Sequence, residues 1–386
     1  MSKWKTIKLG DICEIVTGST PSTLKQEYWD GSFYWVTPAE ISDGDYYIEK
    51  TQRKLTEAGI SSAGLRIMPV GTVLLSSRAP IGKVAITAVE MACNQGFKNF
   101  VCGEKIHNRF LYYFLKNNKH YLNSLGRGAT FKEISKSIVC EIEIPLPPLE
   151  EQKRIADILD KASNLIDLRK QQLEKMDLLM KSKFIDMFGD PVTNPKGWQV
   201  QRIEELCEAI FGGGTPSKSN SEYYDGDIPW VTSKDMKSIL ISDSIDHIND
   251  KAVLNSSAKY IPKQSLLMVI RSGILKHTLP LGINTRVVTI NQDMKAFIPN
   301  ANMNVWFMFY TFKMHEKSLL NNVRAVTADN IEFSIIRNLM VPVPFLELQN
   351  QFAAFVEEVE KQKAVMQQSL EKMETNYKAL MQEYFG

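Results

Sequence analysis

The sequence predicts an α+β protein in which one structural unit occurs twice, each copy being a mixed α/β domain followed by a long helix. Three observations lead to this prediction. Sequence motifs recur in the same order, two long stretches have apolar residues at heptad spacing, and prolines precede each stretch. The chain has 386 residues, enough for two or three domains. With 44% hydrophobic and 23% charged residues it has the composition of a folded protein.

The internal repeat is the most informative feature. The Thr-Pro-Ser motif at residues 20–22 recurs at 215–217, and Trp-Val-Thr at 35–37 recurs at 230–232, an offset of 195 in both cases. Later matches are 197 residues apart, including the Asn-Gln pairs at 94–95 and 291–292 and the Phe-Gly pairs at 188–189 and 385–386. Ordered matches at a nearly constant offset indicate a duplication that fills the chain.

The first part of each copy combines strands and short helices. Segments rich in β-branched and aromatic residues, bounded by Gly and Pro, predict strands at Phe33–Thr37, Thr72–Ser77 and Val84–Thr87. Aromatic-rich segments predict short buried helices at Asn108–Asn118 and Val305–Lys313. We expect their aromatic side chains to belong to the core rather than to stack on bases.

The second part of each copy is a long helix with a heptad seam. The first helix is expected from about Glu150 to Phe188, ending at a Gly-Asp-Pro stop, and the second from about Glu347 to the C-terminus. Of 20 heptad core positions 17 are apolar, which favours an antiparallel coiled coil between the two helices. The principal seam residues are Ile155, Leu159, Ile166, Leu173, Met176, Met180, Phe352, Val356, Val359, Met366, Leu370, Met373 and Tyr377.

These elements divide the chain into five segments. They are a first domain at 1–148, a central helix at 149–188, a linker at 189–197, a second domain at 198–346 and a C-terminal helix at 347–386. Antiparallel helices would place the domains at opposite ends of a rod roughly 50 Å long, at about 1.5 Å per residue. Duplex DNA has the same two-fold symmetry. The domains carry +4 (18 basic, 14 acidic) and +1 (15 basic, 14 acidic), a weak positive excess for a DNA-binding protein.

Several motifs resemble those of type I restriction-modification specificity (S) subunits. The resemblance is carried by the segment IPLPPLEEQKRIA at 144–156, by the Thr-Pro-Ser, Trp-Val-Thr and Asn-Gln motifs, and by a degraded copy, VPVPFLELQ, at 341–349. It implies two target recognition domains, each reading one half of a bipartite double-stranded DNA sequence. It also implies helices that set the spacer and dock two methyltransferase (M) subunits, which use S-adenosylmethionine. Restriction (R) subunits, which use ATP and Mg²⁺, complete such complexes, so no cofactor is expected in this chain.

Candidate DNA-binding residues follow from the chemistry of base edges. Arg and Lys suit guanine, and Asn and Gln suit adenine. In the first domain the candidates are Arg78, Lys83, Gln95, Lys98, Arg127 and Thr130, and in the second Arg271, Lys276, Arg286, Gln292, Lys295, Arg324 and Thr327. The shared Thr-Pro-Ser and Asn-Gln motifs can also be structural turns. Features common to both copies cannot explain two different half-sites, so positions that differ, such as Lys276 or Arg286, are favoured as base readers.

No catalytic or membrane signature accompanies these motifs. The sequence has no GxxxxGK[ST] phosphate loop, no HExxH and no CxxC pair, and no apolar run of membrane-spanning length or secretion signal. We therefore predict a non-catalytic, cytoplasmic DNA-specificity subunit. The alternatives are a subunit of a related type IIB-like system, a coiled-coil adaptor that binds only proteins, and a methyltransferase or nuclease with unrecognised motifs.

Overall fold

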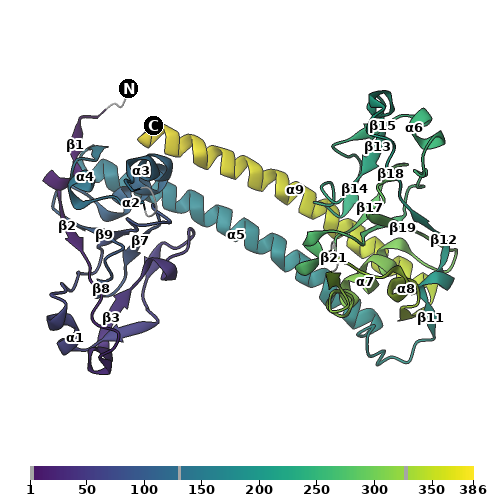
Figure 1. Ribbon diagram of the computed structural model, residues 1–386, viewed down its shortest axis with the longest axis horizontal. Helices are drawn as coiled ribbons and strands as arrows, with labels where there is room; N and C mark the ends of the chain where they lie inside the picture. Colours follow the sequence, from purple (N-terminus) through teal and green to yellow (C-terminus); the bar gives the residue numbers. More distant parts are fainter. Residues whose placement is uncertain (1–3, 129–131, 326–328) are drawn as a thin grey trace. The chain divides into compact units, whose positions relative to one another are not determined.

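The computed structural model describes residues 4–128, 132–325 and 329–386. They form two compact units, the first made of residues 1–170 and 368–386 and the second of residues 171–367. Each unit contains one mixed domain together with part of both long helices (Figure 1).

The first unit is built on a five-stranded sheet with the order β2-β9-β6-β7-β4. Its strands are β2 (Cys13–Thr17), β9 (Lys98–Cys102), β6 (Val73–Leu75), β7 (Val84–Thr87) and β4 (Tyr47–Ile48). Within this sheet the β4–β7 pairing is parallel and the other pairings are antiparallel. A second sheet has the order β5-β3-β8 and consists of β5 (Arg53–Leu55), β3 (Trp29–Val36) and β8 (Met91–Cys93). A third sheet pairs β1 (Thr6–Lys8) with β10 (Glu143–Pro145).

The α-helices described in the first domain are α1 (Glu57–Ser62), α2 (Asn108–Asn117), α3 (Lys119–Leu125) and α4 (Lys136–Cys140). Helix α2 packs on β6 and β7. All four of its aromatic side chains are buried in the core, as predicted: Phe110, Tyr112, Tyr113 and Phe114. They form core rather than an exposed base-stacking surface.

The second unit repeats this topology strand for strand. Its five-stranded sheet has the order β12-β19-β16-β17-β14, with the bounds β12 (Cys207–Gly212), β19 (Met294–Pro299), β16 (Leu266–Val269), β17 (Leu281–Asn284) and β14 (Leu240–Ile241). The smaller sheets are β15-β13-β18 and β11-β22, with β15 (His247–Ile248), β13 (Ile228–Val231), β18 (Thr289–Ile290), β11 (Val200–Arg202) and β22 (Met340–Pro342). The duplication and the α+β class are therefore confirmed.

The second domain also has features of its own. Its helices are α6 (Asp250–Leu254), α7 (Val305–Leu320) and α8 (Phe333–Arg337), and a short ribbon pairs β20 (Arg324–Ala325) with β21 (Asp329–Asn330). Helix α7 extends seven residues beyond the predicted Lys313. A 3₁₀ turn, η6 (Gly273–Lys276), lies between β16 and β17. This connection is four residues longer than the equivalent one in the first domain.

The two long helices are α5 (Leu149–Phe188) and α9 (Leu346–Phe385). Helix α5 ends where predicted, because Gly189 follows with a φ of 80°, which favours glycine and stops the helix. In the first unit the start of α5 and the end of α9 belong to the same hydrophobic core, to which α5 contributes Ile155 and α9 contributes Phe385. In the second unit Phe184 of α5 lies against Phe352 at the start of α9, with ring centroids 5.4 Å apart. Within each unit the two helices therefore run antiparallel.

The predicted seam is largely buried. None of its 13 principal residues is exposed, and Ile155, Leu159, Met180, Phe352 and Val356 have no exposed surface. Beyond Met180 the heptad spacing would continue to Lys183 and Met187, but the residues that are buried at this end of α5 are Phe184 and Phe188. These two side chains pack against Phe307 of α7. The heptad pattern gives way there because the helix enters the core of a domain.

Candidate DNA-reading surface

In the first unit the predicted DNA-binding residues gather at one end of the five-stranded sheet. Strands β6 and β9 are antiparallel, as are β6 and β7, so the end of β6 adjoins the starts of β7 and β9. Arg78 follows β6, Lys83 precedes β7, and Gln95 and Lys98 lie at the start of β9. The fold thus brings together four residues that are up to 20 positions apart in the sequence.

Glu133 links three of the cationic candidates. Its Oε2 lies 2.9 Å from Nε of Arg78 and its Oε1 lies 3.1 Å from Nζ of Lys98. Its backbone exchanges two hydrogen bonds of 3.0 Å with that of Arg127. Partial burial acts to raise the pKa of the Glu133 carboxyl, but the hydrogen bonds from Lys98 and Arg78 hold it below its usual value. Glu133 is therefore an ionised centre around which these cations are arranged. Thr130 lies outside the described residues.

The shared Thr-Pro-Ser and Asn-Gln motifs meet at the same end of the sheet. Oγ1 of Thr20 donates to Oε1 of Gln95 over 2.5 Å, and Nε1 of Trp35 donates to the carbonyl of Ser19 over 3.1 Å. Nζ of Lys83 donates to the carbonyl of Pro38 over 2.9 Å. These bonds support the structural interpretation of the two motifs, while Gln95 itself remains exposed.

The second unit places its candidates in the same way. Arg271 follows β16, Lys276 lies in η6 ahead of β17, and Gln292 and Lys295 flank the start of β19. Nε of Arg271 lies 2.6 Å from Oδ1 of Asp293, and Nζ of Lys276 lies 3.6 Å from Oδ2 of Asp329.

The remaining candidates of the second unit differ in their placement. Thr215 donates to Gln292 as Thr20 does to Gln95, and Nζ of Lys295 lies 4.7 Å above the ring of Phe333. Arg286 follows β17, at the opposite end of that strand from Lys276, and does not join the group. Arg324 lies in β20, and Thr327 falls outside the described residues.

Sequence reasoning missed the carboxylates of this surface. Glu133, Asp293 and Asp329 each pair with a candidate cation. A search for basic residues and amides does not select them. Their closeness in sequence to the predicted DNA-binding residues was the one signal that could have identified two of them. Glu133 lies shortly after the candidates Arg127 and Thr130, and Asp293 directly follows the Asn-Gln motif at residues 291–292.

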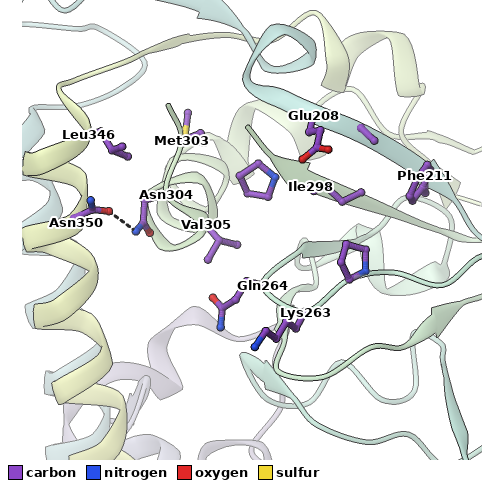
Figure 2. Close-up of a pocket in the computed structure, with 13 residues that line it drawn as sticks. Glu208, Phe211, Lys263, Gln264, Ile298, Met303, Asn304, Val305, Leu346 and Asn350 are labelled. Carbon is purple, nitrogen blue, oxygen red and sulfur yellow. Dashed lines mark hydrogen bonds between the residues drawn. The ribbon is translucent and has the colours of Figure 1, made fainter. Parts of the chain in front are cut away.

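The other end of the second sheet carries a cavity of about 600 Å³ (Figure 2). It lies between the start of β12, the end of β19, the start of α7 and the start of α9. Nδ2 of Asn304 donates to Oδ1 of Asn350 over 2.9 Å within it, and its charged lining residues are Glu208 and Lys263. None of the predicted DNA-binding residues that the structure describes lines this cavity, so the cationic surface and the cavity are separate features.

Comparison with known proteins decides the family. The model of the type I restriction modification DNA specificity domain matches residues 1–177 and again residues 195–375. The chain belongs to the type I restriction-modification specificity subunits. The two matches cover nearly the whole chain, one for each copy of the repeat.

Named relatives of this specificity subunit agree. It is 31% identical over 372 residues to the type I restriction enzyme MjaIX specificity subunit of Methanocaldococcus jannaschii, covering 92% of this chain and 86% of the relative. It is 31% identical over 227 residues to the EcoR124I/EcoR124II specificity subunit of Escherichia coli, covering 56% of this chain and 55% of the relative.

Solved structures support the fold. The crystal structure of the S subunit from M. genitalium matches with a TM-score of 0.62 at 14% identity, covering 100% of this chain and 96% of that one. A chain from a structural study of complex assembly and conformational transition in a type I R-M system matches with a TM-score of 0.58 at 19% identity, covering 99% and 97%. No helix among the described residues of this subunit has the length and apolar character needed to cross a membrane.

Proposed function

We propose that this specificity subunit directs DNA methylation to a bipartite sequence and itself catalyses no reaction. Each domain reads one half of the target through the end of its five-stranded sheet. The observation that carries this proposal is that both copies gather an arginine, a lysine and a glutamine at the same sheet end, where duplicated strands position them. Such groups hydrogen-bond to base edges and phosphates.

The long helices connect the reading surfaces and offer a docking face. Leu165 and Leu168 of α5 are each 54% exposed, and Leu179, on the same side of the helix, is 50% exposed. Apolar side chains that face solvent on a helix commonly mark a protein interface. We assign this face to two M subunits and the spacing of the half-sites to the helices.

The chemistry belongs to the partners. S-adenosylmethionine binds to the M subunits, and ATP and Mg²⁺ to the R subunits that complete the complex. Among the described residues of this chain, no group of three or more His, Cys, Asp or Glu side chains could hold a metal ion.

The test is a methylation map. The chain is expressed with its cognate M subunit in cells that lack other DNA methylation, and the DNA is sequenced with modification-sensitive reads. We expect a split motif with methyladenine in each half. Methylation by this chain alone would reveal an enzyme. An absence of methylation, with the M subunit active beside another S subunit, would favour a protein adaptor.

A further inference from the structure

Arg78 and Arg271 occupy equivalent positions in the two copies, although simple sequence offsets do not align them. Each follows the middle strand of its five-stranded sheet, β6 or β16. Each forms an isolated β-bridge with a residue from a later part of its domain, Glu133 in the first copy and Asn330 in the second. The local offset is 193 residues because the second copy has four more residues between this arginine and β17.

A carboxylate holds Nε of each arginine, but the two carboxylates come from different places in the fold. Glu133 holds Arg78 over 2.9 Å, and Asp293 holds Arg271 over 2.6 Å. In the second copy the position of Glu133 is occupied by Asn330, and in the first copy the position of Asp293 is occupied by Gly96. Each copy therefore supplies one carboxylate to the arginine from one of two alternative positions.

The outer edge of each guanidinium is left free. The side chains of Arg78 and Arg271 are 46% and 49% exposed. Among the described residues, the terminal Nη nitrogens of the two arginines have no hydrogen-bond partner. The backbone fixes the position of each side chain, and the carboxylate fixes the orientation of its planar head. Two parallel N–H donors remain, and they match the O6 and N7 acceptors of guanine.

We propose that Arg78 and Arg271 each read a guanine, one in each half of the DNA target. This inference rests on the proposed function. The neighbouring carboxylate offsets the positive charge that a phosphate contact would use, and it leaves the directional donors that a base edge requires. Because the carboxylates come from different positions, the two arginines approach their half-sites differently. A shared arginine is therefore compatible with half-sites that differ in sequence.

The test applies the methylation map to the full chain with its M subunit. The wild-type motif is expected to contain a guanine in each half. Arg78→Lys keeps the charge but loses the two-donor fork, so discrimination at one guanine of one half-site should fall about tenfold or more, with the other half unchanged. Arg271→Lys should do the same in the other half. The matched controls, Arg66→Lys and Arg202→Lys, alter exposed arginines paired with Glu14 and Glu205, and they should leave the motif unchanged.

Several results would overturn the proposal. A wild-type half-site without guanine would do so directly. An unchanged motif with uniformly weaker methylation would identify phosphate contacts instead. If an arginine variant fails to co-purify with M, Glu133→Ala and Asp293→Ala keep the arginine and remove the acceptor that supports it. Unchanged discrimination in both of these would also contradict the proposal. The absence of any split motif for the wild type is a different result, because it contradicts the proposed function itself.

Discussion

Gln152 and Gln349 make the same three hydrogen bonds in the two copies. Oε1 of Gln152 accepts from the backbone N–H of His107 over 2.8 Å, and its Nε2 donates to the carbonyls of Lys105 and Pro147, each over 2.9 Å. Gln349 accepts from the N–H of Asn304 over 2.9 Å. It donates to the carbonyls of Asn302 and Pro344 over 3.2 and 2.8 Å. Both side chains are fully buried, so this glutamine joins each domain to the first turn of its long helix.

Replacing this glutamine should destabilise the joint. Gln152→Leu fills a similar volume but removes the hydrogen-bond partner of the buried Pro147 carbonyl and of two partly buried backbone groups, the His107 N–H and the Lys105 carbonyl. Unsatisfied groups of this kind cost roughly 1–3 kcal/mol each, so we expect a clear fall in the melting temperature and faster hydrogen exchange at the start of α5. Gln172→Leu, at an exposed position of the same helix, is the control. Equal melting temperatures for the two variants would show that the glutamine does not stabilise the joint.

Asp160 of α5 is the second anchor of the first domain. The hydroxyls of Tyr46 and Tyr113 each donate to its Oδ1 over 2.6 Å, and Arg109 contacts its Oδ2 over 2.5 Å. Burial and these hydrogen bonds to Asp160 raise the pKa of both tyrosines, which therefore remain protonated donors. Asp160→Asn removes the charge that these three donors share. We expect a loss of about 2 kcal/mol in the stability of the first unit, measured by chemical unfolding.

The equivalent residue in the second copy provides a matched control. Glu357 accepts one hydrogen bond, from Nε1 of Trp306 over 3.2 Å. Glu357→Gln should therefore cost less than Asp160→Asn, because the one donor that Glu357 has among the described residues is the neutral indole N–H of Trp306. A larger loss for the second-copy variant would contradict the assignment of Asp160 as an anchor.

His315 should make the second unit sensitive to acid. It is 4% exposed within α7, and burial lowers its pKa from the ordinary value of 6.5. The unfolded chain therefore binds a proton more readily than the folded chain. Stability contributed by the neutral imidazole is complete above about pH 6.5 and falls by up to ~1.4 kcal/mol per pH unit below it, until the folded-state pKa is reached.

Thermal melting at pH 7.5 and pH 5.5 measures this effect. His315→Gln should reduce the difference between the two melting temperatures. The control, His277→Gln, changes an exposed histidine and should leave the difference unchanged. An identical acid shift in the wild type and the His315 variant would assign the sensitivity to other groups.

The helices are predicted to act as the ruler of the DNA target. Ion pairs between Lys170 and Glu374, and between Asp177 and Lys363, indicate which helix positions face one another. Deleting residues 167–173 together with 369–375 removes one facing heptad from each helix and preserves the seam. About 10 Å is lost at ~1.5 Å per residue, so the spacer between half-sites should shorten by about three base pairs. An unchanged spacer in the methylation map would show that the helices do not set it.

The architecture could be predicted from the sequence because a duplication and a heptad spacing can both be recognised directly from the order of the residues. The recurrence of the Thr-Pro-Ser motif predicted two copies, and the Gly189 stop marked the end of α5. The arrangement of the reading surface was not predictable. Four extra residues after Arg271 hide its equivalence to Arg78, and the carboxylate that pairs with each arginine comes from a different position in each copy. Such pairs depend on strand register, which local patterns do not specify.

The most direct test of the central claim is the exchange of one domain. Residues 198–346 are replaced by the second domain of another specificity subunit with a known target, and the chimera is mapped with the same M subunit. We predict that one half-site changes to that of the donor, while the other half-site stays as in the wild type. A change in both half-sites, or in neither, would contradict the account in which each domain reads its own half of the target.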